Sequence, residues 1–300
     1  MPIHTVAIVG ASGNIGAPIV HALLAANYTV TAISRATSTA TFPPSVRVIK
    51  TDLSSLSALT TAFTGQDAVI VTTASAAVSD QFVLVDAAVA AGVKRFLPSE
   101  FGHATAKVSG GLGVMMGGKT EMAAYVAEKA RVNEGFSWTG VATSPFFDWG
   151  LDHGVWGVDL KERKVRVIDS GEEIVSTSTL GFVAKAVVAV LEREEETRNK
   201  LVEVVEFNVS QNEVVRILEE VVGERFGVER VDGKVLGQRG EEKLKEGDFG
   251  GAFFDLLLAW NFTDGGKHAV KQEEMANVWL GLKGQSVKEA LKKYVKEHSE

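Results

Sequence analysis

Thr5-Val6-Ala7-Ile8-Val9-Gly10-Ala11-Ser12-Gly13-Asn14-Ile15-Gly16 stands near the start of the chain and continues into a helix-like segment, residues 18–26. The β-branched apolar run is typical of a buried strand, and the glycines after it mark a turn into a helix. Gly10 permits a tight turn, Gly13 lets the backbone approach a pyrophosphate, and Gly16 lets the helix pack closely on the strand. Free N–H groups and the positive end of the helix dipole attract an anion. We therefore expect a dinucleotide-binding turn whose contacts come from Gly10, Ser12, Gly13, Asn14, Ile15 and Gly16.

Strand-like and helix-like segments alternate through the first half of the chain, which predicts an α/β fold with a Rossmann-type, doubly wound parallel sheet. The expected strands are 29–33, 46–49, 68–72, 95–97 and 139–142, and the expected helices are 56–63, 80–91 and 119–133. After Phe146 the pattern loosens, with strands expected at 166–168 and 202–207 and helices at 180–192, 212–222, 251–259 and 287–298. We expect an NADP-binding domain at 1–150 and a smaller C-terminal substrate-side α/β lobe at 151–300, parts of which return to the main sheet. The glycine-rich stretch 110–118 is expected to be a mobile loop over the site or a featureless connection.

Composition narrows the function classes. The 300 residues are 45% hydrophobic and include no cysteine, so the chain can bury a large core and has no disulfide, thiolate nucleophile or cysteine metal site. The formal net charge of −7 falls entirely in the second half, which argues against nucleic acid and anionic membranes as partners. The six histidines show no metal-ligand spacing, and no targeting or membrane-spanning segment is evident. We expect a cytoplasmic monomer or homodimer that acts on a small-molecule substrate and holds no metal.

The end of the second expected strand selects the nicotinamide cofactor. NAD sites usually place an acidic residue there, but this chain reads Ser34-Arg35, and no acid appears before Asp52. The guanidinium of Arg35 suits the 2′-phosphate of NADP, with Ser34 and Thr37 as further donors. The alternative is that Arg35 is only an exposed residue in a polar loop. We expect NADP(H) as the cofactor.

The segment Lys94-Arg95-Phe96-Leu97-Pro98-Ser99-Glu100-Phe101-Gly102, with the glycine-rich turn and Arg35, closely resembles the isoflavone reductase-like and phenylcoumaran benzylic ether reductase-like branch of the NmrA-like proteins. These are atypical short-chain dehydrogenases, and the resemblance covers most of the chain. It implies an NADPH-dependent reductase in which the nicotinamide lies near Ser144, Pro145 and Phe146. Ser99 and the small residues Thr73, Ala74 and Ser75 follow strands and are expected to pass beside the cofactor, although small residues there also serve close packing.

Tyr125 and Lys129 match the Tyr-x-x-x-Lys pair with which short-chain dehydrogenases move a proton. We interpret the match as a decoy, because Lys129 stands near the end of its helix, whereas Lys119 lies at the right distance from the next strand. Four residues before Lys119 is Met115, which has no ionisable hydroxyl. Isoflavone reductase-like enzymes also lack that tyrosine and use a lysine at this place, so the resemblance implies that Lys119 is catalytic. An apolar cleft would lower its pKa and let it relay a proton; holding the nicotinamide ribose is the alternative.

Aromatic side chains near the expected cleft suggest the substrate. Phe101, Phe147, Trp149 and His153 are expected to line a pocket, although aromatic residues in such places also build cores. His103 is expected to be an ordinary polar loop residue rather than an acid–base group. The favoured function is a reductase that transfers hydride to a carbonyl, an activated double bond or a benzylic carbon of a small aromatic or secondary-metabolite substrate. The alternative is a non-catalytic NAD(P)-sensing protein like NmrA itself.

Overall fold

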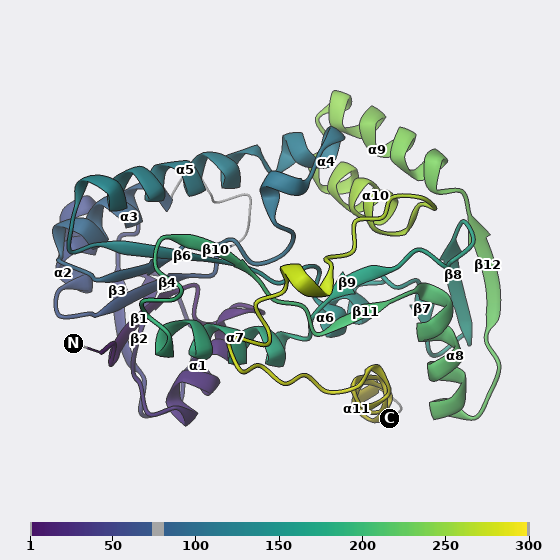
Figure 1. Ribbon diagram of the computed structural model, residues 1–300, viewed down its shortest axis with the longest axis horizontal. Helices are drawn as coiled ribbons and strands as arrows, with labels where there is room; N and C mark the ends of the chain where they lie inside the picture. The colour runs from purple at the N-terminus through teal and green to yellow at the C-terminus, as the bar shows by residue number, and fades with distance from the viewer. Residues whose placement is uncertain (1, 74–80, 299–300) are drawn as a thin grey trace.

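A seven-stranded sheet in which every strand runs parallel to its neighbours forms the larger lobe of the protein (Figure 1). The computed structural model describes residues 2–73 and 81–298. Across the sheet the strands are β10 (Lys200–Glu203), β6 (Ser137–Ala142), β5 (Arg95–Leu97), β4 (Ala68–Val71), β1 (Thr5–Val9), β2 (Thr29–Arg35) and β3 (Arg47–Thr51). This is the strand order of a doubly wound Rossmann sheet with β10 added beside β6, so the expected fold class is confirmed.

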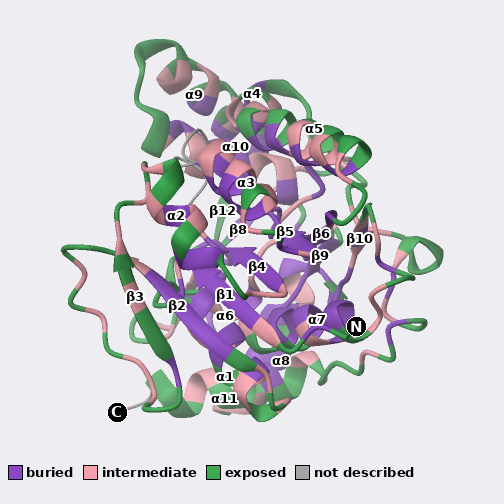
Figure 2. Ribbon diagram, turned by 90° about the vertical axis from the view of Figure 1, so that its left-hand side faces the viewer, coloured by how far each residue is buried: buried purple, intermediate pink, exposed green. Residues whose placement is uncertain are grey.

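Helices cover both faces of this sheet. On one face lie α1 (Gly16–Ala25) and α7 (Leu180–Glu192), and on the other lie α2 (Leu56–Phe63), α3 (Gln81–Ala90) and α5 (Gly117–Val132). A parallel sheet covered on both faces requires strands that are apolar on both sides, and β4 is buried along its whole length. Figure 2 shows the central strands buried and the edge strand β3 largely exposed.

A smaller lobe lies at the other end of the molecule (Figure 1). Its sheets are β12-β8-β7 and the antiparallel pair β11-β9, made of β7 (Val158–Asp159), β8 (Lys164–Ile168), β9 (Val175–Thr177), β11 (Phe207–Val209) and β12 (Gly227–Val231). Its helices are α6 (Phe147–Asp152), α8 (Gln211–Val222), α9 (Gly233–Glu246), α10 (Phe249–Phe262) and α11 (Val287–His298). Short 3-10 helices span Thr105–Lys107 and Gln272–Glu274. None of the helices among the described residues is both long and apolar enough to span a bilayer.

The chain passes between the two lobes more than once. After α6, β8 and β9 in the smaller lobe, α7 and β10 return to the larger sheet, and β11 leaves it again. Ala276 and Leu280, which follow α10, also pack into the core of the larger lobe. Residues of the second half of the sequence therefore stabilise the sheet that the first half begins.

The strand predicted at 202–207 is in fact two strands in two different sheets. β10 ends at Glu203 and β11 begins at Phe207. The N–H of Val204 still bonds to the end of β6, whereas the N–H of Glu206 bonds to the end of β9 in the smaller lobe. An apolar run alone could not reveal that its two ends pair with different partners.

The glycine-rich stretch 110–118 is helical, and the prediction of a loop was wrong. It forms α4 (Gly110–Met115) and the first turn of α5. Oε1 of Glu241, on α9, accepts a hydrogen bond from the N–H of Gly111 at 2.8 Å, and Leu112 and Met116 pack against α10. Tertiary packing here outweighs the low helix propensity of glycine.

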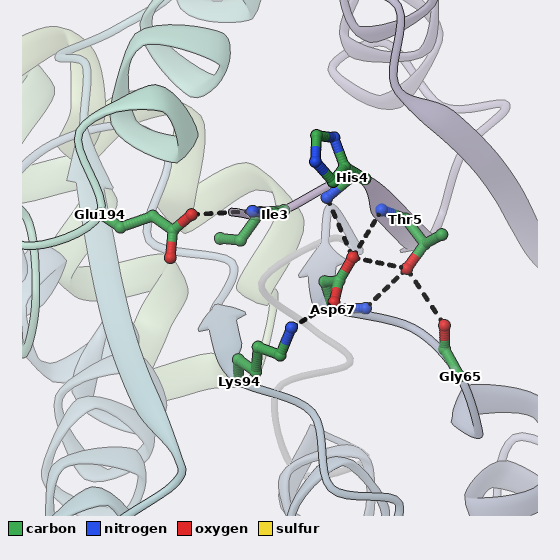
Figure 3. A network of polar contacts seen from close by, with 7 residues as sticks. All are labelled: Ile3, His4, Thr5, Gly65, Asp67, Lys94 and Glu194. Carbon is green, nitrogen blue, oxygen red and sulfur yellow. Dashed lines mark hydrogen bonds and ion pairs between the residues drawn. The ribbon is translucent and has the colours of Figure 1, made fainter. Parts of the chain in front are cut away.

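Four donors converge on the carboxylate of Asp67 at the amino ends of the central strands (Figure 3). The N–H groups of His4 and Thr5 and the Thr5 hydroxyl each donate to Oδ2 at 2.9 Å, and Nζ of Lys94 donates to Oδ1 at 2.7 Å. Burial raises the pKa of Asp67, but these donors more than offset it and hold the pKa well below its usual range. Glu194, just after α7, accepts a further bond from the N–H of Ile3 at 2.7 Å, so this network joins four segments of the larger lobe.

We predict that Asp67→Asn lowers the free energy of unfolding by about 2 kcal/mol at neutral pH, because hydrogen bonds to a charged group contribute about 1.5–3 kcal/mol. A carboxylate whose folded pKa is lowered contributes stability above its unfolded pKa, and that contribution disappears as the pH falls through the folded value. The difference between the variant and the natural protein should therefore shrink below about pH 4. Urea titrations at neutral and acidic pH measure it.

The matched control is Asp52→Asn, since Asp52 is exposed and its carboxylate, among the described residues, accepts hydrogen bonds from Ser54 alone. Its effect should stay within about 0.5 kcal/mol. Equal losses of unfolding free energy in the two variants would show that the Asp67 network stabilises the fold no more than an exposed aspartate does.

Candidate active site

The glycine-rich turn between β1 and α1 is sterically tight on its inner side. Gly10 has φ of 87°, in the left-handed region that favours glycine, and a Cβ there would lie 2.8 Å from Oγ1 of Thr72. The Thr72 hydroxyl itself donates to the Gly10 carbonyl at 3.0 Å. A Cβ on Gly16 would overlap the Gly10 carbonyl oxygen and approach Cα of Ala11 to 2.8 Å. Gly13 meets only the Gly10 carbonyl, at 3.3 Å, so the outer side of the turn is open.

That outer side presents backbone donors. Ser12, Gly13 and Asn14 are exposed, and within the described part of the chain the N–H groups of Ser12, Asn14 and Ile15 donate no hydrogen bond. They lie at the amino end of α1, where the helix dipole is positive. Free donors at this end of a helix suit the pyrophosphate of a dinucleotide.

Arg35 ends β2, directly beside the strand that leads into the turn. Ile33 of β2 is the register partner of Val9, so both strands end at the same edge of the sheet. The Arg35 side chain is exposed and forms no ion pair with any described residue. Ser34 is half-buried and Thr37 is exposed in the turn that follows. This exposed cation beside the turn fits a 2′-phosphate.

The ends of β4 and β5 are tied together at the same edge. The Ser99 hydroxyl donates to the Thr73 carbonyl at 2.7 Å. Oγ1 of Thr73 and Nε2 of Gln81 are buried without a hydrogen-bond partner in the described chain. Buried polar atoms of this kind are uncommon unless a ligand or water completes them. Ala74 and Ser75, which we expect at the cofactor, lie outside the described residues.

The backbone after β6 is held in an unusual conformation. Ser144 has φ of 57°, which costs a residue with a side chain of the order of 1 kcal/mol. The N–H groups of Thr143 and Ser144 both donate to the Gly102 carbonyl at 2.9 Å, which fixes this geometry. The Pro145 carbonyl accepts bonds from the end of β9, and Phe146 is half-buried beside it. The chain after β6 is thus locked against the chain after β5.

Lys119 lies in the first turn of α5 and points toward this edge. It is only 5% exposed, and its Nζ donates to the Phe101 carbonyl at 3.1 Å. Burial lowers the pKa of Lys119, and the negative charge of Glu100 partly offsets that effect. The positive end of the α5 dipole also disfavours an ammonium group here. A buried amine with a lowered pKa is the property that proton transfer near neutral pH requires.

Tyr125 and Lys129 are used in packing α5 against α3. The Tyr125 hydroxyl donates to Oδ1 of Asp86 at 2.7 Å, and Nζ of Lys129 pairs with the same oxygen at 2.6 Å. The Tyr125 ring also packs edge-on against Phe82. Both members of the Tyr-x-x-x-Lys match are therefore engaged by one aspartate of the neighbouring helix, which supports their interpretation as a decoy.

Two polar residues that the sequence did not assign to the site, Glu100 and His103, interact electrostatically with Lys119, and a third, Asn261, interacts with His103. Glu100 Oε1, His103 Nε2 and Asn261 Nδ2 are buried without a hydrogen-bond partner among the described residues. Burial raises the pKa of Glu100 to about 7, and Lys119 partly offsets this. Burial lowers the pKa of His103 to about 4; the Asn261 amide opposes the shift, and the charges of His268 and Lys119 add to it. Glu100 stands within the segment that carries the family resemblance, but Asn261, on α10, has no local sequence signal.

The expected pocket residues do not converge on one cavity. Phe101 packs in the core of the larger lobe, and Phe147 is fully buried in the core of the smaller one, with its ring 5.1 Å from that of Trp156. Both side chains are therefore part of a hydrophobic core and do not line a pocket. Trp149 is half-buried and stacks on the exposed ring of His153 at 4.1 Å. Of the four expected pocket residues, Trp149 and His153 are the two that remain partly exposed.

An open groove of about 460 Å³ lies between α4, α9 and α10. Its aromatic wall is Trp260, on which His268 stacks at 3.6 Å. His268 is also the residue whose charge acts on His103, so the groove adjoins the cluster around Lys119. Among the described residues, no three histidine, aspartate or glutamate side chains are grouped to hold a metal ion.

Comparisons with known proteins place the chain in a family. Residues 2–148 match the NmrA-like family. The oxidoreductase poxI of Penicillium oxalicum is 32% identical over 94% of this chain and 91% of its own length. The chain belongs to the NmrA-like family. A second relative of this NmrA-like protein, the oxidoreductase aprR of Aspergillus flavus, is 33% identical over 97% of this chain and 98% of its own length.

Solved structures share the fold of this NmrA-like protein at low identity. Leucoanthocyanidin reductase of Vitis vinifera in complex with NADPH has a TM-score of 0.80 at 18% identity, over 97% of this chain and 99% of that one. AtPrR2 with NADP+ and (+)pinoresinol gives 0.79 at 22%, over 98% and 99%, and an isoflavone reductase gives 0.77 at 21%, over 98% and 100%. The resemblance to isoflavone reductase-like proteins is confirmed, and the two relatives confirm the oxidoreductase class.

We predict that Gly16→Ala destabilises the protein by about 1–3 kcal/mol, the usual cost of an atom forced into a close-packed site. The added Cβ would meet backbone atoms of Gly10 and Ala11, which cannot move without opening the turn. Thermal or urea unfolding measures the loss, and dinucleotide affinity should fall with it.

Gly181→Ala is the matched control, because Gly181 is an exposed helical glycine of α7 with nothing within 4 Å of an added Cβ. It should be neutral or stabilising by up to about 1 kcal/mol. A Gly16→Ala variant as stable as the control would show that the turn is not tightly packed.

Proposed function

We propose that this protein is an NADPH-dependent reductase that delivers hydride to a small aromatic or secondary-metabolite substrate, at a carbonyl, an activated double bond or a benzylic carbon. The observation that carries the proposal is a buried lysine, Lys119, at the same sheet edge as a dinucleotide-binding turn. NADPH, when bound, would supply the hydride. The oxidoreductase relatives favour an enzyme over a non-catalytic sensor.

The cofactor would lie across the carboxyl ends of the strands. The N–H groups of Ser12, Asn14 and Ile15 would hold the pyrophosphate, and Arg35, with Ser34 and Thr37, would hold the 2′-phosphate. Orphaned polar atoms at Thr73 and Gln81 would meet the middle of the cofactor. Ser99, Ser144, Pro145 and Phe146 would line the nicotinamide end. Ligand binding at this edge is the general rule for open α/β sheets.

Lys119 would supply or remove the proton that accompanies hydride transfer. Its burial excludes water, and its hydrogen bond to the Phe101 carbonyl fixes the direction of Nζ. His103 is a second polar group at the site, since its buried Nε2 lacks a partner. Because burial lowers the pKa of His103 to about 4, its ring is neutral near pH 7 and suits hydrogen bonding to a substrate oxygen.

Two aromatic pairs support an aromatic substrate. Trp149 and His153 stack at α6, which follows β6, and Trp260 and His268 stack along the groove. Flat aromatic surfaces bind aromatic rings by stacking and burial. The direct test is NADPH oxidation with a panel of aromatic ketones, enones and benzylic ethers. Turnover of at least one class supports the reductase, whereas tight NADPH binding with no oxidation across the panel would favour the sensor.

We predict that Arg35→Ala raises the Kd for NADPH about 10- to 100-fold and leaves the Kd for NADH unchanged. The loss corresponds to a hydrogen-bonded charge pair worth about 1.5–3 kcal/mol, which only the 2′-phosphate can form. Fluorescence titration of both cofactors measures it. Arg47→Ala is the control, because Arg47 is an exposed residue at the opposite, amino end of β3. Equal weakening of NADPH and NADH by Arg35→Ala would refute the phosphate contact.

We predict that Lys119→Met lowers kcat by at least about 100-fold, the typical contribution of a positioned acid–base group, while the Kd for NADPH changes by a few-fold at most. Lys129→Met should keep kcat, because Lys129 is paired with Asp86 in the α3–α5 contact. Steady-state kinetics on a substrate found in the panel gives the comparison. The assignment fails if Lys129→Met is inactive and Lys119→Met is not.

A further inference from the structure

Glu100 carries a carboxylate that the rest of the protein leaves almost unsupported. The residue is 1% exposed, and Oε1 has no hydrogen-bond partner among the described residues. Oε2 receives only a long bond, 3.5 Å, from the Thr105 hydroxyl. No arginine or lysine forms an ion pair with it within the described chain. A buried carboxylate without strong donors is destabilising, so its presence calls for a reason other than stability.

The fold makes room for this side chain. Glu100 follows β5 and lies over β6, where its Cγ is 3.5 Å from the place that a Cβ on Gly140 would occupy. A Cβ at position 140 would lie 2.6 Å from Cδ1 of Leu201 and 3.3 Å from the Trp138 ring, whereas its contact with Glu100 would be an ordinary one. Glu100 thus lies alongside Gly140, and Nζ of Lys119 bonds to the carbonyl of the next residue, Phe101.

Lys119 needs a negative neighbour to stay charged. Its Nζ bonds to one neutral carbonyl, it is buried, and it stands at the positive end of the α5 dipole. Of the ionisable groups around it, His103 is neutral above about pH 4, and His268 is held farther out, against Trp260. Glu100 is the carboxylate whose charge favours the protonated lysine.

We propose that Glu100 is a positioning residue for the reaction: its buried carboxylate, once ionised, keeps the Lys119 ammonium protonated, and so able to donate a proton, at and above neutral pH. The inference rests on the proposed reductase function, but the coupling between the two side chains is measurable without any substrate. In the Glu100→Gln variant, the part of the pH profile of kcat that reflects ionisation of Lys119 should move to lower pH. This holds whether the lysine acts as acid or as base.

The stability of the Glu100→Gln variant distinguishes a structural role of Glu100 from a functional one. Burial raises the pKa of Glu100 to about 7, above its unfolded value, so the stability linked to its protonated form is lost as the pH rises through about 7. Glutamine resembles the protonated acid in shape and stays neutral. The urea midpoint of Glu100→Gln should therefore match the natural protein at about pH 4, below the unfolded pKa of a glutamate, and exceed it at about pH 9. A variant that is less stable at both pH values would show that the carboxylate is structural and would overturn the proposal.

Chemical labelling of the lysine amine measures the protonation of Lys119 directly. Acetic anhydride, which reacts with neutral amines, is applied to the folded protein over a range of pH, and acetylation of the Lys119 peptide is followed by mass spectrometry. A nearby opposite charge shifts a pKa by about 1–3 units. Loss of the Glu100 charge should therefore move the labelling midpoint down by at least about one pH unit, which is about a tenfold gain in labelling below the midpoint. An unchanged midpoint overturns the proposal.

Two variants calibrate the result. Glu100→Asp keeps the negative charge, so its labelling midpoint for Lys119 should lie close to that of the natural protein. Glu203→Gln removes another largely buried carboxylate, which is paired with Lys107, and should leave the Lys119 midpoint unchanged. A shifted labelling midpoint, together with no NADPH oxidation in the presence of any substrate, would refute the proposed reductase function and support the Glu100–Lys119 coupling. NADPH oxidation that depends on Lys119, with an unshifted midpoint, would refute the coupling and support the reductase.

Discussion

Parallel strand pairing is the constraint on which the rest of this structure depends. Because all seven strands run in one direction, the chain after each of β1, β2, β4, β5 and β6 emerges at the same edge of the sheet. That single fact brings together the glycine-rich turn, Arg35 and Ser99, which are far apart in sequence. Helices on both faces and the returning β10 then hold the edge in place, and the smaller lobe lies beyond it.

The amino and carboxyl ends of the strands differ in how well their charged side chains are hydrogen-bonded. At the amino ends, Asp67 is surrounded by donors and contributes to stability. At the carboxyl ends, Glu100, His103 and Lys119 are buried with few partners, and Ser144 holds a strained backbone. Unsatisfied and strained groups cluster at sites of function because a ligand or a reaction uses them, while the rest of the fold supplies the stability. Asp67 and Glu100 thus contrast a carboxylate that stabilises the fold with one that we propose serves the reaction.

Much of the larger lobe could be predicted from sequence because its signals are local. The turn at Gly10 to Gly16 and the buried run of β4 each depend on a few adjacent residues, and the helices 56–63 and 180–192 have the predicted bounds. The errors arose where distant contacts decide the structure. Gly111 is helical because Glu241 caps it, and the split between β10 and β11 depends on partners in two sheets. For the same reason Phe147 is a core residue, and Asn261 came to the site without any local signal.

The central claim is that the turn, Arg35 and Lys119 act on one extended dinucleotide. A crystal structure of the protein with NADPH tests it most directly. We expect the pyrophosphate on the N–H groups of Ser12, Asn14 and Ile15, the 2′-phosphate on Arg35, and Nζ of Lys119 within hydrogen-bond reach, about 2.7–3.2 Å, of the nicotinamide ribose or of a bound substrate. A nicotinamide ring that points away from Lys119, or a cofactor that binds elsewhere than this sheet edge, would contradict it.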